Sequence, residues 1–262
     1  MNWNLTDDQK MVRDMVREFV VAEVAPNAAE WDRGKYFPSE IFEKLGELGL
    51  FGMVADEEYG GAGLDLIGYC LVLEELARGD ASTCVAISVT NSLFCAPLQR
   101  YGTSEQKERF LCPCVNGEWL GAFCLSESGA GSDAAALSTI ARREGDDFVL
   151  SGSKAWVTNG AVCGAMLVFA VTDPESARSR VSAFVIPADH PGASIVHEED
   201  KLGIRSSRTN QVALDDCRIP REWMLGEEGQ GLAIALNSLD GGRVGIAAQA
   251  VGIGHAALAF TL

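Results

Sequence analysis

The part of the sequence best suited to chemistry is a run at residues 123–133, Phe-Cys-Leu-Ser-Glu-Ser-Gly-Ala-Gly-Ser-Asp. A Gly-x-Gly-Ser loop that follows a strand presents backbone N–H groups and hydroxyls to one concave surface, which suits the polar edge of a ring or a pyrophosphate. The alternative is a plain glycine turn between strands, and the residues alone favour neither interpretation. The run is not a Rossmann fingerprint, because the sequence lacks G-x-G-x-x-G and a surrounding strand–turn–helix pattern.

The elements before this run are expected to be helices. Thr6-Asp7-Asp8-Gln9 has the form of a capping box, and valines then recur at every fourth position from Val12 to Val24. Glycine, proline and capping residues divide the chain from Pro26 to about residue 119 into further segments. The additional helices are expected at 38–49, 65–79 and 83–101, with a short one starting at Thr103.

After about residue 120 the apolar runs become short and alternate with glycine and proline, which predicts strands. The pattern becomes helical again in two stretches, and the last shows no stop signal before Leu262. The expected strands lie at 148–151, 166–171, 181–186 and 211–214, and the late helices at 229–239 and 244–262.

These patterns predict an α+β multidomain chain. We expect an N-terminal all-α domain over 1–119 and a middle β-barrel or sandwich domain over 120–225. The start of a C-terminal α-helical domain is expected over 226–262.

Charge and composition exclude several classes of function. A formal net charge of -16 and a pI near 4.6 disfavour nucleic-acid binding, because the acidic field repels phosphates. We see no uncharged apolar run of about 18 residues, so no membrane span is expected. The start of the chain resembles neither a secretory signal nor a transit peptide. This predicts a cytoplasmic protein if bacterial, or a mitochondrial matrix protein if eukaryotic.

The eight cysteines are expected to be reduced and structural. They are scattered through apolar runs, and no CxxC pair or His-rich partner completes a metal site.

The run at 123–133 resembles the flavin-binding signature of acyl-CoA dehydrogenases, an aromatic-x-Leu/Val-Ser/Thr-Glu-Pro-Gly-x-Gly-Ser-Asp pattern. Ser128 departs from that pattern, since it stands where the family has proline, which would pre-set the turn. Further segments resemble family motifs in the same order along nearly the whole chain. They lie at 59–63, 152–160, 201–205, 215–220 and 239–243.

The resemblance implies FAD as the cofactor and assigns residues to its site. Ser126 would bond the pyrimidine edge of the flavin, Trp156 would pack on the ring, and Thr158 would donate its hydroxyl to N5. The alternatives are a core tryptophan and an ordinary strand threonine. The full set implied for FAD is Phe123, Leu125, Ser126, Gly131, Ser132, Trp156, Val157 and Thr158.

The resemblance also implies an acyl-CoA substrate, contacted by Ser132, Asp240 and Arg243. Asp240 and Arg243 lie three residues apart and so share one helix face, where a surface ion pair is the alternative interpretation. Arg243 would supply a local cation for a CoA thioester in an acidic chain.

The implied reaction is the α,β-dehydrogenation of a fatty acyl-CoA, as in fatty acid β-oxidation. A glutamate takes the α proton while the β hydrogen leaves as hydride to N5 of the flavin. In most members of the family that glutamate lies beyond the position matching Leu262. In other branches it matches Gly242, which has no side chain. No catalytic base is therefore assigned within the chain, which we expect to be truncated.

The Ala/Gly-rich helix around Gly241 and Gly242 most resembles short-chain, butyryl-type members. Three interpretations remain open: an incomplete dehydrogenase, a flavin- or acyl-CoA-binding fragment or half of a two-chain enzyme, and a flavin oxidase or monooxygenase of the same fold. The family further implies a homo-oligomer in full-length relatives and electron-transfer flavoprotein as the electron acceptor.

Overall fold

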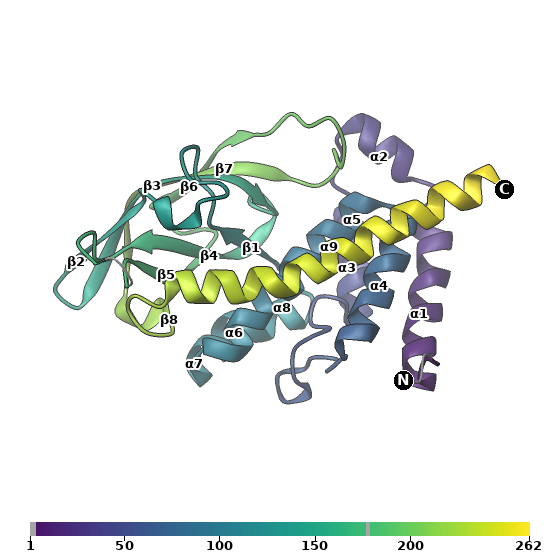
Figure 1. Ribbon diagram of the computed structural model, residues 1–262, viewed down its shortest axis with the longest axis horizontal. Helices are drawn as coiled ribbons and strands as arrows, with labels where there is room; N and C mark the ends of the chain where they lie inside the picture. Colours follow the sequence, from purple (N-terminus) through teal and green to yellow (C-terminus); the bar gives the residue numbers. More distant parts are fainter. Residues whose placement is uncertain (1–3, 177–178) are drawn as a thin grey trace.

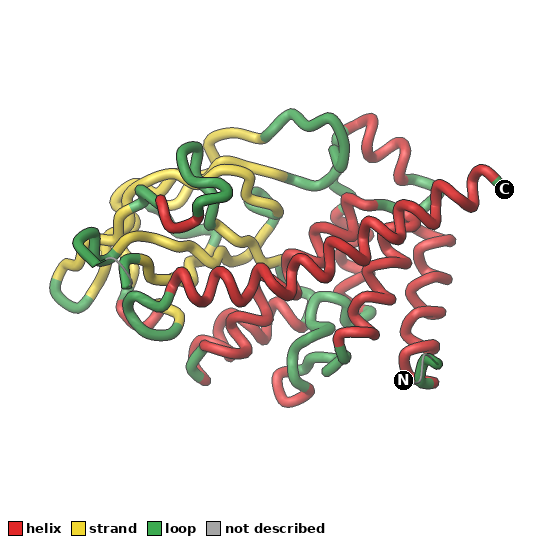
Figure 2. The backbone as a smooth tube through the Cα atoms, viewed as in Figure 1, coloured by secondary structure: helices red, strands yellow, loops and turns green. Residues whose placement is uncertain are grey.

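The computed structural model describes residues 4–176 and 179–262. Helices gather at one end of the molecule and strands at the other, and one long C-terminal helix runs past both (Figure 1). The tube in Figure 2 shows the same separation of helix from strand. The expected order of a helical region, a β region and a further helical segment is confirmed.

Side-chain caps explain where several helices begin. Asp65 accepts a hydrogen bond from the N–H of Gly68, and Asp80 accepts from the N–H groups of Ser82 and Thr83. Asp80 therefore starts its helix two residues earlier than the expected 83–101. Capping boxes form at Thr6, as expected, and at Thr103, where the expected short helix begins. The π-helical segment η3 (Thr90–Cys95) joins α5 to α6. The N-terminal helices are α1 (Asp7–Phe19), α2 (Ala28–Gly34), α3 (Ser39–Glu47), α4 (Leu66–Gly79), α5 (Ala81–Val89), α6 (Ala96–Tyr101), α7 (Ser104–Gln106) and α8 (Cys112–Val115).

The strands form one eight-stranded sheet in which β1 pairs in parallel with β4 and the remaining order is β6-β7-β3-β2-β4-β5-β8. All four expected strands are present, as β3, β4, β5 and β7, but the expected ranges did not include β1, β2, β6 or the two-residue β8. Strand β2 is polar and β6 is an exposed edge strand, so neither carries a buried apolar run. The strands are β1 (Leu120–Cys124), β2 (Ile140–Glu144), β3 (Asp147–Thr158), β4 (Cys163–Val171), β5 (Val181–Pro187), β6 (Ala193–Glu198), β7 (Thr209–Ile219) and β8 (Met224–Leu225).

The helical and β regions are joined through the Asn159 side chain, which is fully buried in the turn after β3. Its amide nitrogen donates to the carbonyl of Ala86 in α5 at 3.0 Å and to the carbonyl of Gly121 in β1 at 3.0 Å. It also lies 3.4 Å from the Thr90 hydroxyl in η3. One amide group thus fixes where β1 and β3 meet the helices.

The C-terminal segment is a single helix, α9 (Gly231–Thr261), rather than the two helices expected from the sequence. It continues through Gly241 and Gly242, and its buried face includes three glycines, at Gly242, Gly245 and Gly252. An added Cβ at Gly252 would lie 2.3 Å from the Glu74 carbonyl oxygen. The missing side chains therefore let α9 lie directly against α4, which it crosses in the view of Figure 1.

Two helical stretches pass a length-and-composition test for a membrane span, so the expectation that no run is apolar enough was wrong. The stretch Ala81–Tyr101 is mostly buried, as expected for a core helix: 78% of its most apolar 18-residue segment lies inside the protein. Helix α9 passes the same test with only 17% of its corresponding segment buried, and it packs on α4 and α5. Length and composition alone do not distinguish a membrane span from an apolar helix that packs against other protein.

We expect Gly252→Ala to lower the free energy of unfolding by about 1–3 kcal/mol, because the new methyl group would collide with the α4 backbone. Gly254→Ala is the matched control. A Cβ at Gly254 would meet nothing within 4 Å, so this change should raise stability by up to about 1 kcal/mol through helix propensity. Urea unfolding of both variants measures the difference. Equal effects would contradict the described contact between α9 and α4.

Candidate functional site

A cavity of about 310 Å³ lies where the end of β1, the last residues of β3 and one face of α9 meet. Most residues assigned from the sequence come together there, although they come from distant parts of the chain. Those that line the cavity are Phe123, Leu125, Ser126, Gly131, Ser132, Trp156, Thr158 and Arg243; the others lining it include Val89, Leu93, Leu236 and Leu239.

Trp156 faces this cavity because β3 bulges just before its end. The pairing of β3 with β7 changes register between Lys154 and Val157, and Trp156 has a φ of 58°. A bulky residue in this left-handed region is strained, and such strain is often found at functional sites. The bulge leaves Trp156 60% exposed while Lys154 and Val157 on either side are fully buried. Trp156 is therefore not the core tryptophan of the alternative interpretation.

The structure places two assigned residues away from the cavity lining. The Val157 side chain lies in the apolar core of the sheet. Asp240 forms a 2.7 Å ion pair with Arg243, and both side chains are about 70% exposed. The expected shared face of α9 is thus present, but only Arg243 reaches the lining. The pair lies well inside α9, which begins at Gly231.

The polar lining of the cavity includes three hydroxyls, on Ser126, Ser132 and Thr158. None of these side-chain oxygens has a hydrogen-bond partner within residues 4–176 and 179–262. A methyl group added to Gly131 would meet nothing within 4 Å and would occupy the space beside these hydroxyls. Free hydroxyls next to an exposed indole fit a flat ligand with a polar edge, which is the chemistry of a flavin ring.

Comparison with known proteins decides the family. The N-terminal domain of acyl-CoA dehydrogenases matches residues 6–118, and the middle domain matches residues 122–217. The butyryl-CoA dehydrogenase structure from Megasphaera elsdenii is 42% identical, with a TM-score of 0.96 over 99% of this chain and 69% of its own. The chain belongs to the acyl-CoA dehydrogenase family.

Two further relatives of this acyl-CoA dehydrogenase chain are informative. The mitochondrial short-chain specific acyl-CoA dehydrogenase of Rattus norvegicus is 48% identical over 97% of this chain. The chain spans 62% of that relative's length. A glutaryl-CoA dehydrogenase from Mycobacterium smegmatis, solved in complex with FADH2, is 36% identical with a TM-score of 0.88 over 95% of this chain and 62% of its own.

A buried ion pair beside the cavity was missed in the sequence, although both partners lie inside the flavin-like motifs. The Lys154 ammonium lies 2.7 Å from the Glu127 carboxylate, with 0% and 5% of their side chains exposed. Glu127 also accepts hydrogen bonds from the N–H groups of Ser138 and Thr139 at 2.8 and 3.0 Å. The signal available was a charged residue in each motif, but sequence alone does not show that the two meet.

The Ser128 departure leaves the turn intact in this family member. Glu127 and Ala130 exchange two backbone hydrogen bonds, at 3.0 and 3.1 Å, around Ser128 and Gly129. The turn is therefore closed by its own backbone without the proline ring.

Hydrogen bonding determines the charge state of the buried carboxylate. Burial alone would raise the pKa of Glu127, but hydrogen bonds from Lys154, Ser138 and Thr139 lower that pKa from 4.5 to about 2. Burial lowers the pKa of Lys154, and the Glu127 carboxylate opposes that change. Near neutral pH we therefore assign both groups as ionised.

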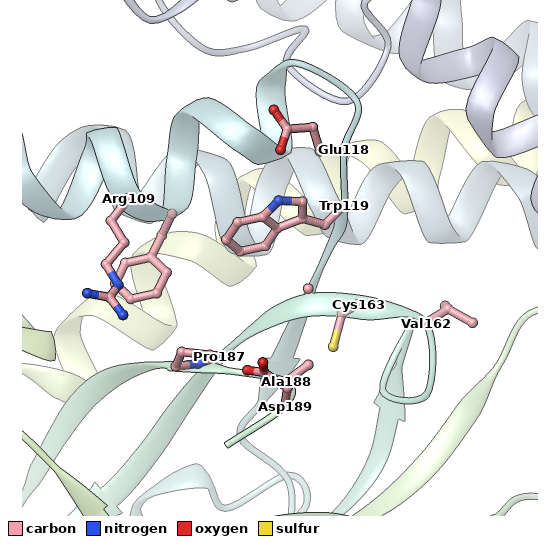
Figure 3. A pocket seen from close by; sticks show the side chains of 10 residues that line it. Arg109, Glu118, Trp119, Val162, Cys163, Pro187, Ala188 and Asp189 are labelled. Atoms are coloured by element: carbon pink, nitrogen blue, oxygen red, sulfur yellow. The ribbon is translucent and has the colours of Figure 1, made fainter. Parts of the chain in front are cut away.

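A second hollow, of about 560 Å³, lies between the helical segment Lys107–Leu111, the start of β4 and the end of β5, and is shown in Figure 3. Trp119 packs on Gly164 of β4, with Arg109 and Cys163 also in the wall. Burial raises the pKa of the Cys163 thiol to about 12, so this sulfur is not a ready nucleophile. None of the residues assigned from the flavin-like motifs lines this hollow.

We predict that Glu127→Gln lowers the free energy of unfolding by about 3 kcal/mol at pH 7. Because the carboxyl pKa is lower in the folded chain, its contribution is complete above about pH 4.5 and is lost as the pH falls toward about 2. Urea unfolding at several pH values between 7 and 3 measures the free energy of unfolding of wild type and variant. The difference between these two free energies should become smaller as the pH falls.

Glu23→Gln is the control for this prediction, because Glu23 pairs with Lys44 at the surface at 2.8 Å. It should produce no such pH-dependent gap. A gap for Glu127→Gln that stays constant from pH 7 to pH 3 would rule out the lowered carboxyl pKa.

Proposed function

We propose that residues 1–262 hold the flavin, and part of the acyl-CoA, of a short-chain acyl-CoA dehydrogenase. The observation that carries the proposal is the strained bulge near the end of β3. This bulge directs the Trp156 side chain toward a cavity whose hydroxyl groups have no hydrogen-bond partner among the described residues. The 48% identity to a short-chain specific dehydrogenase and the FADH2-bound relative support it.

The cavity residues would hold FAD by its ring. Ser126 would bond the pyrimidine edge, Trp156 would cover one face of the ring, and the Thr158 hydroxyl would donate to N5. Thr158 is half-buried and Trp156 is exposed, so both can meet a ligand without a large rearrangement. When bound, FAD would supply a hydride acceptor at N5 for the β hydrogen of the acyl chain.

Arg243 would contact the acyl-CoA from α9. Its guanidinium lines the same cavity as Ser132, and its neighbour Asp240 would keep it oriented through their ion pair. An anionic CoA needs such a local cation, because the chain as a whole carries a charge of -16.

The proton-transfer half of the reaction lacks a candidate among the described residues. No Asp or Glu of that part of the chain lines the cavity. Gly242, which matches the alternative base position of the family, is buried against Leu93 and has no side chain. We therefore infer that residues 1–262 bind both ligands but do not remove the α proton.

A second candidate function is assembly with further polypeptide, which could be a second chain or a continuation of this one. Helix α9 exposes an apolar surface that includes Leu236, Ile246, Val251, Leu258 and Phe260. An exposed apolar patch of this kind marks an interaction surface or an aggregation risk. The family implies electron-transfer flavoprotein as the acceptor for the electrons of the complete enzyme.

We expect Gly131→Val to raise the Kd for FAD about tenfold or more, because the added side chain would project into the cavity. Gly129→Val is the matched control, since Gly129 also has open space around it but does not line the cavity. Fluorescence titration with FAD measures both. An unchanged Kd for Gly131→Val would place the flavin elsewhere.

The second test concerns the missing base. FAD-loaded chain mixed anaerobically with butyryl-CoA should keep its oxidised flavin spectrum and should not reduce a dye acceptor. Bleaching of the flavin would show that a residue of this chain takes the α proton, which contradicts the inference drawn from the cavity lining.

A further inference from the structure

We propose that the buried Glu127–Lys154 ion pair is a positioning device for the flavin ring, because it fixes Ser126 and Trp156 relative to each other. Each charged residue lies next to one of the two cavity residues. Glu127 directly follows Ser126, and Lys154 precedes Trp156 by two positions. The inference rests on the proposed function and extends it to residues that do not touch the cavity.

The pair ties together the two segments that form the cavity. Lys154 Nζ donates to the Leu125 carbonyl at 3.3 Å as well as to the Glu127 carboxylate at 2.7 Å. The N–H of Ala155, between Lys154 and Trp156, donates to the Ser126 carbonyl at 2.9 Å. These three bonds hold the loop after β1 against the part of β3 that directly precedes Trp156.

Glu127 connects this contact to a third segment. Its carboxylate accepts from the N–H and hydroxyl of Ser138 and from the N–H of Thr139, just before β2. The carboxylate is therefore surrounded by donors from two other segments. A shift of Glu127 would break several hydrogen bonds at once, so the loop has one preferred position.

A purely structural role does not by itself require charge at this place. Replacing a buried ion pair with apolar groups of similar size is often neutral for stability, because both charges must be desolvated. Hydrogen bonds between charged groups are directional, so they fix the angle at which the loop after β1 and the bulge in β3 meet. A site held in that way needs little rearrangement when a rigid ring enters it.

The test is the double variant Glu127→Gln, Lys154→Met, which removes both charges and retains side chains of similar length. We expect a folded chain with an unfolding midpoint close to that of wild type. Its Kd should rise about tenfold or more for both FAD and lumiflavin, which is the ring alone, since the cause is a misplaced ring contact. Destabilisation alone cannot raise the Kd while the unfolding midpoint stays close to that of wild type, because nearly all of the chain is then folded and able to bind.

The matched control is Glu23→Gln, Lys44→Met, which makes the same chemical change at an exposed ion pair. It should leave both Kd values unchanged. A folded Glu127→Gln, Lys154→Met variant with wild-type affinity for both ligands would overturn the inference, and so would equal losses in the two double variants. If the double variant does not fold, Glu127→Asp keeps the charge but shortens the reach, and the inference requires that it weaken lumiflavin binding.

Failure of the proposed function has a different signature. In that case wild-type chain itself would bind neither FAD nor lumiflavin. Wild-type binding of both ligands with no effect of the double variant would overturn the positioning role alone.

Discussion

The buried amide of Asn159 is the constraint on which the site depends. Its nitrogen donates to one carbonyl in α5 and one in β1, and its own backbone accepts from Val162 and Cys163 at 2.9 and 2.8 Å. Leaving the buried N–H groups of this amide without partners would cost about 1–3 kcal/mol, which favours the position of the turn in which they meet those carbonyls. The same turn comes directly after Thr158, and its position therefore decides where the cavity lies.

The end of β3 contains residues in strained backbone conformations that are held in place by buried neighbours. Trp156 and Asn159 both have positive φ, at 58° and 66°, and such conformations cost about 1–3 kcal/mol each for residues with side chains. Buried neighbours offset that cost: Lys154 is paired with Glu127, and Val157 packs in the core of the sheet. The strained residue is held from both sides, which is how a large indole remains exposed beside a cavity.

Sequence patterns predicted the elements well where local chemistry decides them. The capping boxes at Thr6 and Thr103 form, and the apolar runs of β4 and β5 are strands. Local pattern failed where distant packing decides. The sequence predicted two helices, at 229–239 and 244–262, yet α9 continues through Gly241 and Gly242, and Gly242 lies on its buried face. Edge strand β6 was not predicted, because its residues are mostly exposed and form no buried apolar run.

The candidate site was predictable from the resemblance to a family, and only in part from residue chemistry. The glycine and hydroxyl run pointed to a concave polar surface, and Ser126, Gly131 and Ser132 do line one. Residue chemistry alone, without the resemblance, did not show that Trp156 would leave the core, since this depends on a change of register against β7. The ion pair between Glu127 and Lys154, which are 27 residues apart in the sequence, was not predicted either.

The indole N–H signals of the chain in a ¹⁵N NMR spectrum test most directly whether a flavin ring binds against Trp156. On adding FAD, the Trp156 signal, assigned with a Trp156→Phe variant, should shift or broaden. Trp31, which is 7% exposed in the helical core, should not change. A Trp156 signal that stays in place while that of Trp119 moves would put the ligand in the other hollow and contradict the account.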